Sequence, residues 1–423
     1  MALFLVFAAL LVLGTPIAYC LGAASVVVLF LDGFKVTTFA NILQSGTAKF
    51  SLLAIPFFIL AGVVMERAGI SRRLVELAKV FVGHIFGGLA IVTVVVSCFF
   101  AAISGSGPAT VAALAPILMP AMEEAGYRKD WAAALIANSG NIGIIIPPSV
   151  IFVIYGVLAE VSIGKLFIAG IIPGLIFGLA LIITSLISLK RQGGIRRMPR
   201  FSARERWDGF KSAVWGILSP VIILGGIYTG VFTPTESAGV AAVYGLFVGL
   251  LIYREIKVKD LWSIFTEAAV STAVVMFIVA NASVFAWLMT TNQIAATISD
   301  ALLSVTTDQI MMLFMINLVL LFAGCFLDSG SAMYIFIPIL MPIIKVIGYD
   351  PLVFGVVATV NLAIGMATPP VGLDLYVACN VSGVSLKSIS IQTIRFVLAS
   401  LIVLMLLTYL PILSTWLPTA MGM

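Results

Sequence analysis

Long apolar stretches, separated by short polar segments, recur from the beginning of the chain to its end. The stretch 166–189 is typical, because it contains no charged residue over a length that can cross a bilayer as a helix. A single secretion signal cannot account for a pattern that recurs up to the C-terminus. The sequence therefore predicts an all-α polytopic membrane protein. We interpret ten segments as crossings: 2–14, 16–31, 50–66, 131–159, 166–189, 213–231, 235–253, 269–290, 351–380 and 392–415.

Two further apolar segments contain a polar turn, and their arms are too short to be two ordinary crossings. Segment 92–120 contains "SGSGPAT", and segment 311–343 contains "LDSGS". Glycine and proline in such turns permit a tight reversal of the chain. We therefore predict two re-entrant helical hairpins, which enter the membrane and return to the same side.

Each predicted hairpin is followed by an apolar segment that a pair of prolines interrupts. Pro147 and Pro148 interrupt 131–159, and Pro369 and Pro370 interrupt 351–380. Proline has no N–H, and its ring disrupts the preceding helical turn. The freed carbonyl groups are tolerated within a membrane only where they are buried against protein or line a cavity. We therefore predict two discontinuous helices.

These features belong to an internal repeat. "APILMPAMEEAGY" at 115–127 matches "IPILMPIIKVIGY" at 337–349, and the same separation of 222 residues carries the first proline pair onto the second. We divide the chain into a first repeat at 1–190, a basic linker at 191–211 and a second repeat at 212–423. Each repeat holds five crossings and one hairpin, and an odd number of crossings inverts the second repeat relative to the first.

The distribution of basic residues supports this inverted topology. Cytoplasmic loops of membrane proteins are enriched in Lys and Arg. If the linker is cytoplasmic, the basic segments 67–79 and 254–259 fall on the same side, whereas the segment 291–310 and the C-terminal "LSTWLPTAMGM" fall outside and contain no Lys or Arg. The C-terminus is therefore expected outside. The exceptions are Lys35, Lys49, Lys165 and Lys345.

The composition narrows the possible functions. Of the 423 residues, 62% are hydrophobic and 10% are charged, and the net charge of +5 comes from short loops, so it does not indicate nucleic-acid binding. The four cysteines lack metal-ligand spacing, and the only histidine, His84, excludes a histidine metal cluster within this chain. The sequence contains no phosphate-binding GxxxxGK[ST] motif, so it does not indicate an ATPase. We expect no prosthetic group.

Inverted repeats with discontinuous helices are typical of secondary transporters, in which unwound carbonyls bind sodium and helix N-termini attract anionic substrate. Hydroxyl, amide and carboxylate oxygens near the breaks suit a small hard cation. An alternative is that Gly and Pro only kink the helices, but the duplication favours an ion site. The first repeat supplies Ser104, Ser106, Asn138, Ser139 and Asn141, and the second supplies Asp328, Ser329, Ser331, Asn361 and Thr368.

Four acidic residues lie near these features. Asp328 at a hairpin tip is expected to be functional, because an acid inside a membrane is costly, although it could instead cap the second arm of the hairpin. Asp374 and Glu160 follow the breaks and are expected to be solvated near a membrane face. Glu236 is expected to cap a helix.

The sequence leaves other classes of protein open. A permease of an ATP-driven importer needs a cytoplasmic docking helix, and Gly193, Gly194 and Pro199 in the linker argue against one. An ion channel also uses re-entrant loops, but paired inverted hairpins suit alternating access better. An intramembrane enzyme needs a nucleophile–base pair, and we identify none.

Several motifs resemble one known family. "SGNIGIIIPPSV", "FTPTESAGVAAVYG", "MATPPVGLDLYVA" and "LTYLPILSTWLP" resemble the large membrane subunit of TRAP transporters, the tripartite ATP-independent periplasmic type, and the resemblance covers essentially the whole chain. It implies a sodium-coupled elevator-type importer of carboxylates, such as C4-dicarboxylates or sialic acid, in a bacterial or archaeal inner membrane. It also implies a separate small membrane subunit and a periplasmic substrate-binding protein as partners.

The resemblance further implies which residues bind sodium. In the family, each sodium site combines a hairpin tip with the adjacent helix break. The matching positions are Ser104, Ser106, Gly143, Ile146 and Pro148 in the first repeat, and Gly324, Asp328, Gly365, Thr368 and Pro370 in the second. As candidate substrate contacts we take Asn138, Ser139, Asn141, Ser329, Ser331 and Asn361.

The topology can be tested by thiol labelling in intact cells. Single cysteines introduced at 195–205 are expected to react only with cytoplasmic reagents, and those at 416–423 only with periplasmic reagents, because the crossing count and the charges place these segments on opposite sides. Labelling of both segments from one side would exclude the inverted repeat.

Overall fold

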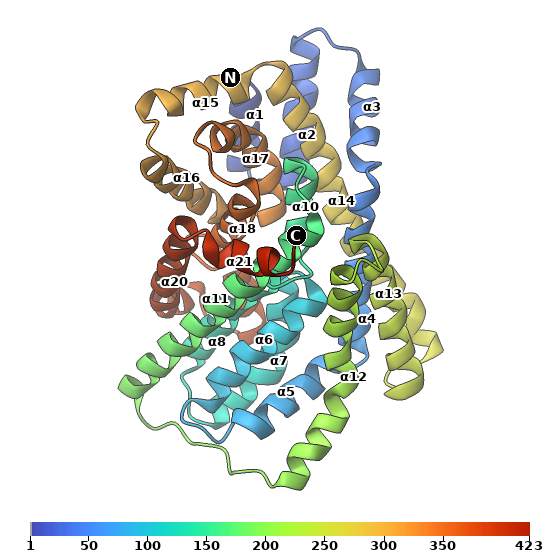
Figure 1. Cartoon of the computed structure of the whole chain (residues 1–423), viewed down its shortest axis with the longest axis vertical. Helices are drawn as coiled ribbons and strands as arrows, with labels where there is room; N and C mark the ends of the chain where they lie inside the picture. The colour runs from blue at the N-terminus through green and yellow to red at the C-terminus, as the bar shows by residue number, and fades with distance from the viewer. Residues whose placement is uncertain (1) are drawn as a thin grey trace.

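The computed structural model describes residues 2–423 (Figure 1). Within these residues every regular element is helical. Seven helices are long and apolar enough to cross a membrane, and an eighth span results if a helix pair bent by 44° is counted as one. The predicted all-α polytopic class is therefore confirmed.

The chain begins with a group of helices that leads to the first hairpin. Between α4 and α5 the turn passes through Gly69 in a left-handed conformation with a φ of 71°. The group consists of α1 (Ala2–Val12), α2 (Ile17–Leu31), α3 (Val36–Thr47), a 3-10 turn at Phe50–Leu53, α4 (Ala54–Arg67) and α5 (Ile70–Val82).

Two antiparallel helices and an interrupted helix follow. The helices α6 (Gly88–Ser104) and α7 (Gly107–Glu124) are joined by a two-residue turn, in which Gly105 has a φ of 60° that favours glycine. The interrupted helix consists of α8 (Lys129–Gly140), α9 (Ile142–Ile145) and α10 (Val150–Ala159). The long α11 (Ile163–Gln192) then leads to the linker at the bottom of Figure 1.

The second half contains a comparable series. Its first helices are α12 (Ala203–Tyr228), α13 (Pro234–Phe247), which continues as a π turn at Val248–Ile252, and α14 (Leu261–Thr291), which follows a 3-10 turn at Val258–Asp260. Its later helices are α15 (Ile294–Val305), α16 (Gln309–Gly324), α17 (Ser329–Val346), α18 (Pro351–Met366), α19 (Leu373–Ser382), α20 (Leu386–Tyr409) and α21 (Ile412–Ala420).

The helices that carry the proline breaks lie in the centre of the molecule. Every residue of α8 from Trp131 to Gly140 and every residue of α18 from Val353 to Met366 is buried. Large apolar side chains are instead exposed on outer helices, for example Leu179 on α11 and Ile402 on α20. This distribution fits a protein whose outer surface contacts lipid and whose interrupted backbone is covered by protein.

The helix starts follow from local capping. Thr233 and Glu236 form a reciprocal capping box at α13, in which the Thr233 N–H donates to Glu236 Oε2 at 2.8 Å and the Glu236 N–H donates to Thr233 Oγ1 at 3.3 Å. The capping role expected for Glu236 is confirmed. Glu160 ends α10 in a left-handed conformation and is exposed, as expected.

Four short helices have no counterpart in the sequence interpretation: α3, α5, α15 and α21. These helices are shorter than a membrane crossing, so the length of apolar segments does not predict them. The sequence of α5, "ISRRLVELAKVFV", is an example. Charged residues interrupt the apolar run along the chain, but the apolar residues share one buried face of the helix, which packs against α6 and α12.

Candidate ion and substrate site

The tip of the first hairpin packs directly against the first helix break. Ser104 Oγ lies 3.0 Å from Thr110 Oγ1, and Thr110 Oγ1 donates to the Ser106 carbonyl oxygen at 2.7 Å. A Cβ atom on Gly143 would lie 2.6 Å from the same carbonyl oxygen. Only glycine therefore allows the break to approach the tip this closely.

The proline pair interrupts the helix at the first break, and hydrogen bonds fix the backbone around it. Ser149 Oγ donates to the carbonyl oxygen of Ile144 at 2.6 Å, and the Ile146 N–H donates to Ile142 at 3.0 Å. A Cβ atom on Gly105 would lie 2.9 Å from the carbonyl oxygen of Pro148. The five sequence-predicted residues of the first repeat thus lie at one junction of tip and break.

The second hairpin meets the second break in the same way. A Cβ atom on Gly365 would lie 2.5 Å from the carbonyl carbon of Gly324, so the two backbones touch. The Thr368 hydroxyl donates to the carbonyl oxygen of Ile364 at 2.6 Å. Both proline pairs, Pro147–Pro148 and Pro369–Pro370, have cis peptide bonds.

Asp328 caps a helix and also lines the central cavity. Its carboxylate caps α17, because Oδ2 accepts from the Ser331 N–H at 3.0 Å and Oδ1 accepts from the Ser331 hydroxyl at 2.5 Å. Asp328 also lines the cavity between the two hairpins. Capping therefore does not remove the carboxylate from the candidate site.

A cavity of about 500 Å³ lies between the two hairpin tips and the helices α4 and α14. Its volume is within the range of small-ligand pockets, about 300–1,000 Å³. The tips contribute two short polar runs and the outer helices contribute two acids and several apolar residues. The polar and acidic lining residues are Ser104, Ser106, Asp328, Ser329, Glu66, Glu267, Ser271 and Tyr334.

Of the six candidate substrate contacts, the cavity lining includes Ser329. Asn361 Nδ2 instead donates to the Asn317 side chain at 2.9 Å, and Asn138 Nδ2 donates to the Thr393 hydroxyl at 3.2 Å. These bonds join α18 to α16 and α8 to α20. The others are Ser331, which bonds to Asp328, and Ser139 and Asn141, which are buried without a hydrogen-bond partner among residues 2–423.

Two acidic residues of the cavity were not anticipated. Glu66 lies in the last turn of α4, and Glu267 lies on α14, where it pairs with Arg67 at 2.7 Å. The partners of this ion pair are 200 residues apart in the sequence. Because the pairing depends on how α14 packs against α4, no local pattern could have revealed it.

Asp374 contradicts the expectation that it is solvated. Its exposed fraction is 0%, and neither carboxylate oxygen has a hydrogen-bond partner among residues 2–423. Cβ atoms on Gly107 and Gly140 would lie 2.8 Å and 3.2 Å from its Oδ2. The expectation was wrong because α19 starts directly after the break and its first turn packs between α7 and α8, so position past the break did not indicate depth.

Two hairpins that meet two interrupted helices around a central cavity are typical of secondary transporters. Solved structures with this overall fold include the Alcanivorax borkumensis YdaH transporter, with a TM-score of 0.62, 14% identity and coverage of 90% of this chain and 88% of that one. Neisseria gonorrhoeae MtrF has a TM-score of 0.60 and 11% identity, with coverage of 90% and 83%. At these identities the similarity establishes the fold alone.

The family is established by sequence. Residues 4–413 match the family described as "Tripartite ATP-independent periplasmic transporter, DctM component", and the chain belongs to this family. The predicted resemblance to the large TRAP subunit is confirmed. The members of this family are transporters, so the chain is a permease subunit and not an enzyme.

The chain is similar to several characterised relatives. It is 42% identical to the C4-dicarboxylate TRAP transporter large permease protein DctM of Pseudomonas aeruginosa, covering 95% of this chain and 94% of that protein. It is 38% identical to the sialic acid TRAP transporter large permease protein SiaM of Vibrio cholerae, covering 97% and 96%. It is 43% identical to the isethionate TRAP transporter permease protein DctMQ of Oleidesulfovibrio alaskensis, of whose length it spans 65%.

The unpaired carboxylate of Asp374 leads to a test of stability. Asp374→Asn replaces a carboxyl group, which must either stay ionised without a partner or take up a proton, by an amide of the same shape that does not ionise. We therefore expect the free energy of unfolding to increase by about 1–3 kcal/mol. Thermal unfolding in detergent measures this change. Asp350→Asn is the control, because Asp350 is exposed and caps α18, where Asn also caps. A lower stability of Asp374→Asn alone would show that a bound cation compensates the carboxylate.

Proposed function

We propose that the chain is the membrane permease of a sodium-coupled importer of small organic anions, of the C4-dicarboxylate, sialic acid or related carboxylate type. The observation that carries the proposal is the cavity lined by both hairpin tips, each of which packs against a helix break. Names of relatives with similar sequences support the carboxylate class.

The proposed sodium sites lie where each tip meets its break. In the first repeat, oxygens are available from Ser104, Ser106 and Thr110 and from the carbonyls of the broken helix. In the second, Asp328 supplies a carboxylate and Thr368 a hydroxyl. These are hard oxygen ligands, which suit sodium. Further ligands of the second proposed site are the backbone groups of Gly324, Gly365 and Pro370.

The proposed substrate lies in the cavity between the tips. Helices α7 and α17 both begin at it, since Ser106 and Asp328 are their N-caps and line it. The positive ends of two helix dipoles favour a carboxylate there. The charge of Asp328 opposes an anion, and a sodium ion bound to Asp328 would remove that opposition. Sodium is therefore expected to bind before the substrate.

An elevator movement is the proposed route of transport. The hairpins and broken helices share one side of the cavity, and α4 and α14 form the other, so that the first group could slide along the second. Glu267 lies near the start of α14, which follows the basic segment 254–259. If that segment is cytoplasmic, the cavity extends towards the cytoplasm, as in an inward-facing state.

The proposed partners are a small membrane subunit, a periplasmic substrate-binding protein and the lipid bilayer of the inner membrane. The C-terminus is proposed to lie outside and the linker inside. Uptake of carboxylate by vesicles that contain the permease and both partners should require a sodium gradient and proceed without ATP. Uptake that needs ATP, or ion current without the binding protein, would exclude this function.

Asp328→Asn separates the sodium role from the capping role. Asn also caps helices, so folding should be retained, whereas loss of a charged ligand costs about 1.5–3 kcal/mol. We expect the sodium concentration for half-maximal uptake to rise at least about tenfold. The matched control is Asp308→Asn, since Asp308 caps α16 through the Met311 N–H at 2.8 Å and does not line the cavity. An unchanged sodium dependence would leave Asp328 as a cap only.

The proline pairs can be tested as a unit. Replacing Pro147 and Pro148, or Pro369 and Pro370, by alanine restores the missing N–H groups and favours helix by about 3 kcal/mol for each proline. We expect folded protein with little or no sodium-dependent uptake, because the carbonyl groups would accept helical hydrogen bonds and would no longer be free to bind sodium. Pro220→Ala is the control, because Pro220 lies inside α12 and does not line the cavity. Normal uptake by both double variants would show that the breaks only shape the packing.

A further inference from the structure

A second pocket lies where α8, α11 and α20 come together, apart from the transport cavity. Its volume is about 410 Å³, and it shares no lining residue with that cavity. Three arginines line it: Arg128 before α8, Arg191 at the end of α11 and Arg395 on α20. A pocket with three guanidinium groups is suited to an anion.

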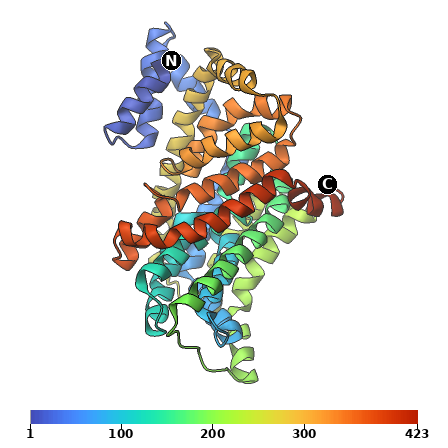
Figure 2. The same ribbon diagram turned by 90° about the vertical axis from the view of Figure 1, so that its left-hand side faces the viewer.

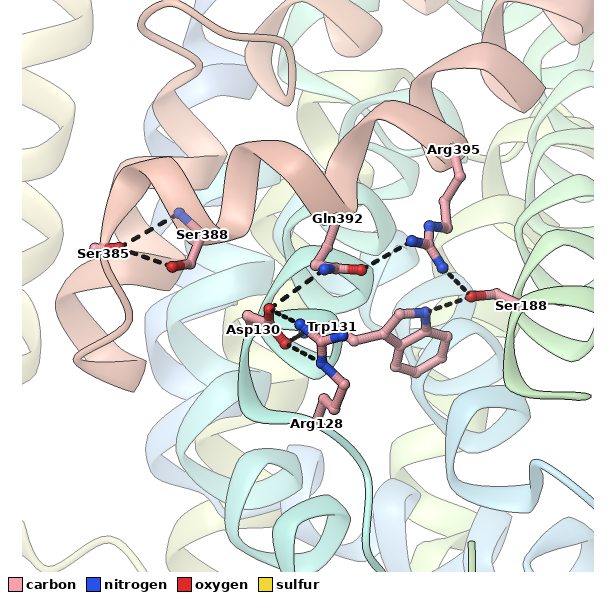
Figure 3. A network of polar contacts seen from close by, with 8 residues as sticks. All are labelled: Arg128, Asp130, Trp131, Ser188, Ser385, Ser388, Gln392 and Arg395. Carbon is pink, nitrogen blue, oxygen red and sulfur yellow. Dashed lines mark hydrogen bonds and ion pairs between the residues drawn. The ribbon is translucent and has the colours of Figure 1, made fainter. Parts of the chain in front are cut away.

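A hydrogen-bonded network fixes the position of Arg395 (Figure 3). Arg395 donates to the hydroxyl of Ser188, which also accepts from Trp131 Nε1 at 2.9 Å. The second terminal nitrogen of the guanidinium, Nη2, donates to Gln392 Oε1 at 2.9 Å, and Gln392 Nε2 donates to Asp130 Oδ2 at 3.3 Å. The guanidinium is therefore held in place by neutral acceptors from two helices.

The charges at this pocket are not balanced. Arg128 is neutralised, because its guanidinium donates to both oxygens of Asp130, at 2.6 Å and 3.1 Å. Arg395 bonds only to neutral groups. Arg191 has no ion pair or hydrogen bond from its side chain to any residue between 2 and 423. Two of the three positive charges thus lack a protein counter-charge.

The pocket opens onto an apolar surface of the outer helices. On α11, Leu179, Ile183 and Ile187 are about half exposed and follow one another at intervals of four, which places them on one face. On α20, Leu398 and Ile402 are exposed by 58% and 64%. The two helices pack side by side (Figure 2), and Ile187 also lines the pocket. Exposed apolar side chains on both helices therefore begin beside the arginines, since Ile187 lines the pocket and Leu398 follows Arg395 by three residues.

We propose that this pocket binds the phosphate of an anionic phospholipid, such as phosphatidylglycerol or cardiolipin. The phosphate lies between Arg191 and Arg395, and the acyl chains cover the exposed face of α11 and α20. Guanidinium groups bind phosphate oxygens through paired N–H donors. Basic pockets between membrane helices bind anionic headgroups on the side where the basic loops lie. The proposal does not depend on sodium coupling or on the transported substrate.

The bound lipid acts on the core of the permease through α8. Asp130 and Trp131 form the first turn of α8, which leads to the first proline break. A phosphate that holds Arg395 and Arg191 together therefore also holds α20 and α11 against α8. We expect the anionic lipid to raise the thermal stability of the purified chain more than a zwitterionic lipid does.

Native mass spectrometry of the purified full chain tests the proposal. Titration with phosphatidylglycerol and with phosphatidylethanolamine should show tighter binding of the anionic lipid. Arg191→Gln should weaken phosphatidylglycerol binding about fivefold and leave phosphatidylethanolamine unchanged. Arg191 is the informative position, because its replacement leaves the network of Arg395 intact. The double variant Arg191→Gln/Arg395→Gln should weaken binding further, by about 25-fold in total.

Arg200→Gln is the matched control, because Arg200 is exposed in the linker and the same charge is removed. This variant should bind both lipids as the unmodified chain does. Equal binding of the two lipids would overturn the proposal, as would unchanged phosphatidylglycerol binding by Arg191→Gln. Displacement of bound phosphatidylglycerol by an excess of inorganic phosphate would also overturn it and identify a site for a free anion.

Discussion

The rest of the structure depends on how the polar backbone is covered where two central helices are interrupted. A membrane interior offers no water to carbonyl and N–H groups that leave a helix, so such groups must contact protein or line a cavity. Here each break is covered by a hairpin tip of its own half. The contact is close enough that a Cβ atom on Gly143 or Gly365 would collide with the facing backbone. Glycine at these positions is thus a condition for burying the breaks.

This covering also concentrates oxygen atoms in the middle of the molecule. The tips and breaks bring together hydroxyls, carbonyls and the Asp328 carboxylate beside a cavity of about 500 Å³. The same packing buries Asp374 between α7 and α8 without a hydrogen-bond partner among residues 2–423, and such burial is costly for an acidic side chain.

Charged groups in the outer parts of the molecule differ in whether a protein group of opposite charge pairs with them. Arg67 and Glu267 are exposed and paired at the mouth of the cavity, so their interaction is screened by solvent. Arg395 is held by neutral groups, and its charge is available to a partner.

The sequence by itself determined the helical membrane class, the family and the location of the tips and breaks. Each of these depends on local chemistry: apolar length decides what crosses a membrane, and proline or glycine decides where a helix stops. The capping role of Glu236 was predictable for the same reason, because its partner is three residues away.

Only the tertiary structure decided which polar side chains meet. It buried Asp374, joined Arg67 to Glu267 and brought Arg191 beside Arg395. It also turned Asn138 and Asn361 towards neighbouring helices and left Ser329 in the cavity. On a helix, the direction of a side chain is known only relative to its own axis. Which neighbour it meets depends on how helices distant in the sequence pack, and no local pattern contains that information.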